Sequence, residues 1–344
     1  MGTSRGASTA ILCMAALLVV ISTISTTSAQ ELTTTFYDQK CPSLFAIVKQ
    51  QVQIAVKAEK RMAASLVRLH FHDCFVNGCD GSILLDDAPG IVTEKNIGGN
   101  NNSARGFEVI DTIKSILECA CPNTVSCADI LAITSRDSAV EVGLTESYPV
   151  YFGRRDSLNS SDSIVNDFLP SPAFNYAELK NNFHNVSLNE TDLIALSGAH
   201  TIGRVRCQII TATTIDDTNI NAVYRAQLAK ECDPALFDPI TTLKNLDLKT
   251  PDKFDNNYFK NLRRNEGILT SDQTLQSTPG INVDIVKDYA QNKENFYRDY
   301  GLSSIKMGNI KVLTGNKGEI RKNCRFVNPV PSIKLPTDPR VASE

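Results

Sequence analysis

The segment Arg-Leu-His-Phe-His-Asp-Cys at positions 68–74 constrains what this chain can fold into more than any other. If the segment is helical, Arg68 and His72 lie one turn apart on the same face, with Phe71 beside them. That face then carries a permanent positive charge, a group that exchanges a proton near neutral pH, and an aromatic ring. Such a face suits the cleavage of a bond whose transition state separates charge.

The next residues, 73–82, are rich in oxygen ligands and include two closely spaced cysteines, Cys74 and Cys79. Hard cations such as Ca²⁺ prefer carboxylate, hydroxyl and carbonyl oxygens as ligands. Asp73 and Asp80 could also be ordinary solvated acids, but their spacing and the two cysteines favour a cation. The sequence therefore predicts a disulfide-closed cation loop directly behind the reactive helix.

The chain begins with the pattern of a secretory signal peptide. Arg5 is the only charge before Glu31, and an apolar stretch at 10–21 leads to the small residues Ser28-Ala29. We expect cleavage after Ala29, so that residues 1–29 are the signal peptide. A membrane anchor is the alternative, but the stretch is shorter than the roughly 20 apolar residues that a spanning helix needs.

Charge and cysteine content narrow the class of protein. The formal net charge is −3, and loss of Arg5 with the signal peptide makes it −4. With no basic cluster, neither nucleic acid nor an anionic membrane is an expected partner. Ten cysteines are present, and nine remain after Cys13 is removed, so disulfides with one unpaired thiol are expected in an oxidising compartment. No zinc-type quartet occurs, and sequons at four sites fit the secretory route: Asn101, Asn159, Asn185 and Asn189.

Apolar residues recur with helical spacing along most of the chain, which predicts a mainly α protein. A first helix is indicated by the apolar stripe Leu44, Ile47, Val48, Val52 and Val56. We expect further helices at 62–71, 104–119, 126–142, 176–184, 191–198, 256–265, 283–291 and 294–307. Strand signals are few, and the one expected hairpin pairs 311–313 with 320–321. The proline-containing segment 329–344 is predicted to be a disordered or processed tail.

A second reactive segment surrounds His200, one of only four histidines. A lone histidine in an apolar helix is most often a core residue. Here, however, Gly198, Ala199 and Gly203 are small enough to let a flat ligand approach closely. One histidine that holds a metal and another that works opposite it form the arrangement of a haem peroxidase.

The chain resembles the class III haem peroxidases, the secretory peroxidases of plants, from Leu32 to about Asn328. Besides the two histidine segments, the resemblance rests on Thr-Phe-Tyr at 35–37 before Cys-Pro at 41–42, Asn-Ser-Ala-Arg-Gly-Phe at 102–107, Val-Ser-Cys-Ala-Asp-Ile at 125–130, Gly-Arg-Arg-Asp-Ser at 153–157, Asp-Asn-Asn-Tyr at 255–258 and Ser-Asp-Gln at 271–273. It implies one domain over residues 30–328 with the haem peroxidase fold, in which a distal and a proximal helical lobe enclose a haem and β-hairpins are short.

The resemblance implies a catalytic role for four distal residues. His72 takes a proton from hydrogen peroxide and delivers it to the departing oxygen, and Arg68 stabilises the charge that develops. Asn100 hydrogen-bonds His72 and keeps it basic. Phe71 shields the oxidised site, so that donors react at the haem edge. His70 is then a structural residue.

The cofactors implied are one haem b and two calcium ions. His200 is the iron ligand, and Asp272 accepts its other ring N–H and makes the imidazole more basic. The implied distal calcium ligands are Asp73, Val76, Gly78, Asp80 and Ser82, with Glu94 linked through water. The implied proximal ligands are Thr201, Asp247, Thr250, Asp255 and Lys253, the last through its carbonyl oxygen only.

Four disulfides are implied in the same way: Cys41–Cys121, Cys74–Cys79, Cys127–Cys324 and Cys207–Cys232. Cys119 is left over, either as a buried free thiol or as a competitor for Cys41, and we expect it to stay reduced. The chain departs from the family at 143–152, which lacks the usual Gly-Gly-Pro, and it contains no tryptophan. Tyr151 stands where a proline near the substrate entrance is common, so we expect an altered donor preference.

The implied activity is that of a donor:hydrogen-peroxide oxidoreductase, which reduces peroxide to water and oxidises phenolic donors in single-electron steps. It would serve cell-wall phenolic oxidation, stress responses and peroxide removal. We expect a secreted monomer, although the tail leaves the vacuole open as a destination. A catalytically silent haem- and calcium-containing wall protein is the alternative. A His/Asp hydrolase is set aside because no Gly-x-Ser-x-Gly motif occurs. The physiological donor and the glycosylated sequons stay open.

Overall fold

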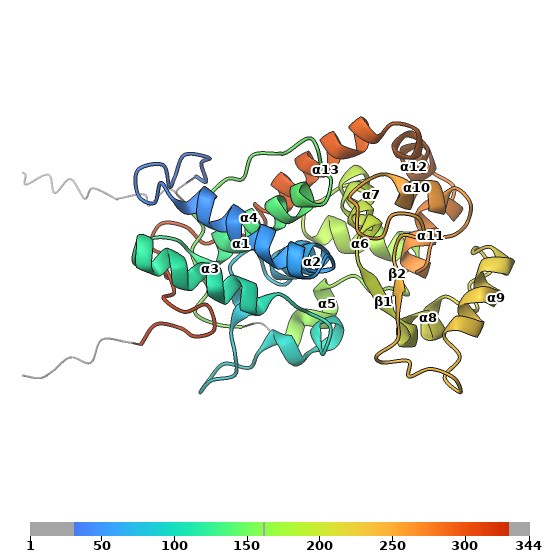
Figure 1. Ribbon diagram of the computed structural model, residues 1–344, viewed down its shortest axis with the longest axis horizontal. Coiled ribbons are helices and arrows are strands. Elements are labelled where there is room, and N and C mark those ends of the chain that lie inside the picture. Colours follow the sequence, from blue (N-terminus) through green and yellow to red (C-terminus); the bar gives the residue numbers. More distant parts are fainter. Residues whose placement is uncertain (1–30, 161, 330–344) are drawn as a thin grey trace, which may run out of the picture.

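Helices form most of the framework of the protein (Figure 1). A computed structural model describes residues 31–160 and 162–329. The predicted signal peptide and nearly all of the predicted tail lie outside these residues. The α-helices are α1 Leu44–Ala58, α2 Met62–Phe75, α3 Phe107–Ala120, α4 Cys127–Glu141, α5 Val165–Phe168, α6 Tyr176–Asn185, α7 Glu190–Ser197, α8 Cys207–Thr213, α9 Ala222–Glu231, α10 Asn257–Leu262, α11 Thr270–Ser277, α12 Ile281–Gln291 and α13 Lys293–Met307.

The helices gather in two groups, with α1–α4 toward one end of the molecule and α6, α7 and α10–α12 toward the other (Figure 1). In the first group, α4 packs against α1, α2 and α3. Its middle is buried on every side, which places it at the centre of the group. In the second group, α7 packs against α6, α12 and α13, and α10 packs against α12. The predicted mainly α class is confirmed.

Each helix predicted from the apolar periodicity is present, with shifted ends. The third helix begins at Phe107 rather than at 104, because Gly106 has a φ of 95° and cannot continue a helix. The helix predicted to end at 265 ends at Leu262, shortly before Asn265 with a φ of 57°. The apolar periodicity did not predict several helices, of which α11 matters most because it carries Asp272. Its sequence has one large apolar residue, Leu275, and so gives no apolar stripe.

Short one-turn helices connect the longer ones and carry several polar residues of the site. They are η1 Ser82–Leu84, η2 Glu94–Asn96, η3 Gly98–Asn100, η4 Asp162–Ile164 and η5 Gly198–Thr201. One small antiparallel sheet joins β1 Arg204–Arg206 to β2 Leu243–Asn245.

The predicted hairpin between 311–313 and 320–321 is wrong. Leu313 pairs with Arg155, and Glu319 pairs with Asp156, so both segments flank the distant segment 155–156 instead of each other. The Asp156 carboxylate fixes this arrangement, since it accepts hydrogen bonds from the backbone N–H of Arg321 and of Ala128, both at 2.9 Å. A pairing held by a residue more than 150 positions away is not visible in local sequence.

A buried ion pair ties α4 to the end of α13. The carboxylate of Asp129 accepts hydrogen bonds from Tyr37 Oη at 2.7 Å, from Gly153 N at 2.8 Å and from Arg154 Nη1 at 2.8 Å. Arg154 also donates to the carbonyl oxygen of Gly308, just after α13. Asp129 and Arg154 are 0 % and 3 % exposed, so each charge depends on the other.

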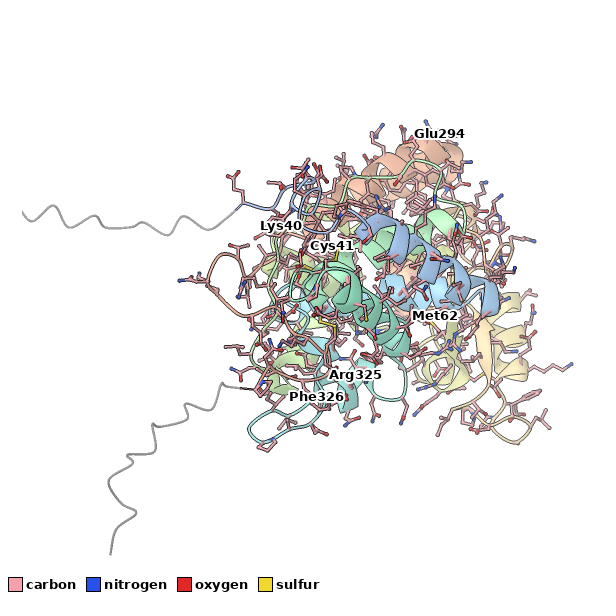
Figure 2. All side chains as sticks on the ribbon, turned by 60° about the vertical axis from the view of Figure 1, so that its left-hand side comes forward. Lys40, Cys41, Met62, Glu294, Arg325 and Phe326 are labelled. Atoms are coloured by element: carbon pink, nitrogen blue, oxygen red, sulfur yellow. A yellow bond between two sulfur atoms is a disulfide. The ribbon has the colours of Figure 1, made fainter. Side chains whose placement is uncertain are left out.

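Four disulfides brace the fold, and they join the four pairs that the resemblance implied. Cys41, which Figure 2 shows next to Lys40, connects the start of α1 to the end of α3, and Cys324, the neighbour of Arg325, is joined to the start of α4. Cys119 is free, as expected, but it is exposed rather than buried. Among the described residues, no helix is long and apolar enough to cross a bilayer.

We predict that Asp129→Asn lowers the free energy of unfolding by about 3–5 kcal/mol, because it leaves the buried Arg154 charge without its carboxylate. Denaturant unfolding measures the change. Glu266→Gln is the control, since it removes the partner of Arg264 from a half-exposed ion pair and should cost less than about 1 kcal/mol. Equal losses in the two variants would contradict the structural role of the buried pair.

Candidate active site

Helix α2 presents the Arg68 guanidinium and the Phe71 ring on one side. Nη2 of Arg68 donates a hydrogen bond to the carbonyl oxygen of Gly99 at 2.7 Å. Burial, Arg206 and Arg61 lower the pKa of Arg68 to about 10, so the guanidinium keeps its charge at neutral pH. The Phe71 ring stacks on Phe75 with centroids 4.1 Å apart, which fixes the aromatic plate that the sequence predicted.

The orientation of His72 is set by Asn100. The Nδ1 atom of His72 lies 2.5 Å from Oδ1 of Asn100. The Asn100 amide itself is oriented, because its Nδ2 donates to the backbone carbonyl of Glu94 at 3.0 Å. An amide oxygen only accepts hydrogen bonds, so Nδ1 of His72 carries the proton and Nε2 keeps its lone pair. His72 is therefore placed to accept a proton through Nε2.

The charge state of His72 agrees with this role. Burial, followed by the nearby Arg68 charge, holds the pKa of His72 well below its usual value, and only the hydrogen bond to Asn100 acts in the other direction. The imidazole is therefore neutral at pH 7 and available as a base. The proton that it accepts is held weakly and is readily passed on.

His70 lies elsewhere on α2, because two residues correspond to about 200° around a helix. It is 4 % exposed, and its Nδ1 is 3.6 Å from Sγ of Cys74. Burial and the charge of Arg154 lower the pKa of His70 to about 3. Its surroundings are those of a core residue, as the resemblance implied.

The second histidine of the pair lies on η5, directly after α7. Nδ1 of His200 is 2.8 Å from Oδ1 of Asp272. The same oxygen accepts a hydrogen bond from Tyr258 Oη at 2.9 Å. In the neutral ring, a carboxylate acceptor again puts the proton on Nδ1 and leaves the lone pair on Nε2. The His200 side chain is 40 % exposed while that of Asp272 is 2 % exposed, so the imidazole is open to a ligand on the side away from the carboxylate.

Tight packing positions His200. A Cβ atom added at Gly198 would lie 2.4 Å from Cε2 of Phe296 and 2.8 Å from Cζ of Phe259. Only glycine therefore lets η5 approach these rings. The Asp-Asn-Asn-Tyr motif at 255–258 gives no role for Tyr258 from sequence alone, and its hydrogen bond to Asp272 is seen only in the structure.

Behind His72, the loop 73–82 buries oxygen atoms that have no hydrogen-bond donor. In the part of the chain that the structure describes, Oδ1 of Asp73 and Oγ of Ser82 are buried without a hydrogen-bond partner. The pKa of Asp73 is held well above its usual value by burial and by the charge of Asp80. Buried acids with unsatisfied oxygens are what a bound cation would stabilise. Val76 and Gly78 are the other two residues of segment 73–82 in the predicted ligand set.

Two features shape this loop around the oxygen cluster. Gly78 has a φ of 124°, and a Cβ atom there would lie 2.8 Å from the Lys311 backbone oxygen, so glycine is required. Glu94 is fully buried, and its charge also raises the pKa of Asp73. The Glu94 side chain therefore acts on the oxygen cluster, while its carbonyl orients Asn100.

A second oxygen cluster adjoins His200. Oγ1 of Thr201 is 3.1 Å from Oδ2 of Asp247, and Oγ1 of Thr250 is 3.1 Å from Oδ1 of Asp255. Thr201 and both acids are buried. Lys253 is exposed, so its ammonium can stay in water, as a carbonyl ligand at this position requires. Four of the five predicted proximal ligands thus converge by their side chains.

Tyr151 does not lie with these residues. It lines a small cavity of about 10 Å³ together with His70, Tyr148 and Arg154, and its carbonyl accepts a hydrogen bond from Arg154 at 2.6 Å. Because His70 and His72 lie far apart around α2, this cavity is not on the side of His72. The geometry gives no support to the expected role of Tyr151 at a substrate entrance.

Comparison with known proteins decides the family. The family model described as "Peroxidase" matches residues 48–292. The chain belongs to the peroxidase family. It is 47 % identical to peroxidase P7 of Brassica rapa over 298 residues, which cover 87 % of the chain and 100 % of the relative. It is 49 % identical to peroxidase 2 of Cucumis sativus over 86 % of the chain and 100 % of the relative. Peroxidase 54 of Arabidopsis thaliana is 46 % identical over 91 % of the chain and 88 % of the relative.

The resemblance to plant class III peroxidases is thereby confirmed, and the protein is a haem peroxidase that uses hydrogen peroxide and a reducing donor. The catalytically silent alternative is not favoured. The donor set fits a haem, because His200 offers an oriented Nε2 lone pair with a buried carboxylate behind it.

We predict that Gly198→Ala destabilises the protein by about 1–3 kcal/mol through overpacking and lowers the amount of haem bound per chain, because it displaces His200. Thermal unfolding and the ratio of haem to protein absorbance measure the two effects. Ser197→Ala is the control on the same segment and should leave both unchanged. A Gly198→Ala protein with normal stability and a full haem content would contradict the packing argument.

Proposed function

We propose that His200 binds the iron of one haem b and that His72 and Arg68 cleave the O–O bond of hydrogen peroxide on the opposite face. The observation that carries this proposal is the matched pair of tautomers. Each histidine donates from Nδ1 to a fixed acceptor and keeps the Nε2 lone pair. The Nε2 lone pair of His200 suits a metal, and the Nε2 lone pair of His72 suits a proton.

The bound haem supplies the redox chemistry, since it gives electrons to the peroxide and recovers them from donors. His72 handles the protons. Its Nε2 takes a proton from one peroxide oxygen and returns it to the other, which leaves as water. The lowered pKa of His72 favours this return. Asn100 keeps the ring in one orientation during both transfers.

Arg68 stabilises the charge that develops on the departing oxygen. Its hydrogen bond to Gly99 holds the guanidinium beside the segment that carries Asn100. The charge and the base are therefore positioned by neighbouring residues of one short segment, 98–100.

We further propose that small phenols are the donors and that Phe71 directs them to the haem edge. A phenol gives up one electron together with its proton, so two donors are consumed for each peroxide. Four disulfides support secretion of the domain 30–328 to an oxidising compartment such as the cell wall, as a monomer without membrane or nucleic-acid partners. The vacuole is the alternative destination.

Two calcium ions complete the proposal. The distal ion would be bound by the 73–82 loop, directly behind His72, with Glu94 acting through water. The proximal ion would be bound by Thr201 and by the residues of the 247–255 segment. The buried acids of each cluster support this assignment, because each needs a positive charge to remain ionised in the protein interior.

We predict that His72→Ala retains the haem but slows the reaction with hydrogen peroxide by at least roughly 10²–10⁴-fold, the range for loss of a general acid–base group. Stopped-flow absorbance after mixing with peroxide gives the rate. His184→Ala is the matched control, because His184 lies on the surface at the end of α6. A near-normal rate in His72→Ala would refute the acid–base role.

We predict two calcium ions per chain, one of which is lost in Asp73→Asn and the other in Asp255→Asn. Metal analysis of the purified protein counts the ions, and thermal unfolding should show a lower Tm in each variant. Asp284→Asn, which changes an exposed acid of α12, should keep both ions. Unchanged calcium content in Asp73→Asn and in Asp255→Asn would exclude both assignments.

A further inference from the structure

A continuous row of aromatic rings leads away from His200. The centroids of His200 and Tyr258 are 6.2 Å apart, those of Tyr258 and Phe259 are 5.0 Å apart, and those of Phe259 and Tyr289 are 5.1 Å apart. These rings come from η5, α10 and α12, and α10 packs against both of the other elements. Helices α10 and α12 lie at the end of the molecule away from α3 (Figure 1). Electron tunnelling falls steeply with distance, so these adjoining rings form a short-stepped route between His200 and α12.

Both tyrosines of this row donate a hydrogen bond to a carboxylate. Tyr258 Oη donates to Asp272, and Tyr289 Oη donates to Oδ2 of Asp299 on α13 at 2.8 Å. A tyrosine that loses an electron becomes a strong acid, so it needs a base that takes its proton. A carboxylate is such a base. Arg298 donates from Nε to the other Asp299 oxygen, Oδ1, at 3.0 Å and makes a longer hydrogen bond from Nη2 to Oδ2 at 3.3 Å. The phenol of Tyr289 is therefore the nearer of the two partners of Oδ2.

Tyr297 provides an internal comparison. Its ring also belongs to the cluster, with its centroid 5.6 Å from that of Phe296, which in turn contacts Phe259. However, Tyr297 Oη donates to the backbone carbonyl oxygens of Phe254 and Gly143. A peptide carbonyl is too weak a base to accept the proton. Tyr297 thus has similar surroundings but no base that can take its proton.

The composition of the chain makes tyrosine the relevant residue. The chain contains no tryptophan, so tyrosine is its most easily oxidised aromatic side chain. Tyr289 is 1 % exposed, and burial with the neighbouring Asp299 raises its pKa, so the phenol is protonated at rest. Oxidation of Tyr289 therefore requires transfer of both an electron and a proton.

We propose that Tyr289 is a redox-active residue that takes up one of the two oxidising equivalents left after peroxide reduction when no donor is present. This proposal rests on the assignment of His200 as the haem ligand. Tyr289 loses one electron, which passes across Phe259 and Tyr258 to the oxidised haem and reduces it by one equivalent. The phenol proton moves to Oδ2 of Asp299, and a neutral tyrosyl radical remains.

The site would hold an oxidising equivalent away from the haem, at the junction of α12 and α13. Asp299 is 18 % exposed, and α13 begins at the surface near Glu294 (Figure 2). The proton held by Asp299 can therefore exchange with water. A phenolic donor that reaches this surface could return the electron and the proton to Tyr289.

Freeze-quench EPR of the haem-loaded protein after one equivalent of peroxide, without donor, tests the proposal. Protein labelled with ring-deuterated tyrosine identifies the signal as a tyrosyl radical by its narrowed hyperfine pattern. We expect the signal to be lost in Tyr289→Phe, which keeps the ring packing, and to persist in Tyr297→Phe. Asp299→Asn, which lacks the carboxylate, should lose most of the signal. Asp299→Glu, which keeps a carboxylate, and Asp284→Asn should both retain it.

A radical that persists in Tyr289→Phe, or that is lost equally in Tyr297→Phe, would overturn the proposal. Haem absorbance recorded on the same samples separates this failure from failure of the proposed function. If the haem spectrum changes with peroxide but no tyrosyl signal forms, the Tyr289 site is refuted while His200 and His72 keep their roles. If the haem spectrum does not change, the proposed function itself fails.

Discussion

One hydrogen bond at each reactive histidine determines what the rest of the site can do. Nδ1 of His72 faces an amide oxygen and Nδ1 of His200 faces a carboxylate oxygen, so both rings keep the Nε2 lone pair. The two acceptors differ in charge. A neutral amide fixes the ring but leaves the low pKa of a buried base, whereas a carboxylate makes the imidazole a stronger donor to a metal. In the proposed mechanism, imidazole thus serves as a base at His72 and as a ligand at His200.

The surrounding structure serves to hold these acceptors and rings in place. Asp73 follows His72 and Thr201 follows His200, so each histidine is one residue from a buried oxygen cluster. A cation in each cluster would fix the backbone next to the reactive ring. The Cys74–Cys79 disulfide closes the first loop, and the packing of Gly198 against Phe259 and Phe296 sets the second. Stability and catalysis therefore depend on the same short segments.

Local sequence was sufficient for one helical face of the distal site and insufficient for Asn100 and for the proximal site. Helical spacing alone placed Arg68, Phe71 and His72 together, because residues three and four apart share a face of a helix. His200 and Asp272 are 72 residues apart, and α11, which carries Asp272, is too polar to show a helical stripe. Only the resemblance to a family connected them. Tyr258 gave no signal of its role, since a buried tyrosine on a helix is equally consistent with simple packing. The strand pairs at Arg155 and Asp156 were missed because a buried carboxylate, rather than strand propensity, selects them.

We propose that His200 binds iron and that the Asp272 carboxylate strengthens the bond. The most direct measurement is the resonance Raman frequency of the iron–histidine stretch in the reduced protein, compared between wild type and Asp272→Asn. We expect a clear iron–histidine band that moves to lower frequency in the variant, because the imidazole loses its anionic acceptor. A band at the same frequency in both proteins, or no such band in wild type, would contradict it.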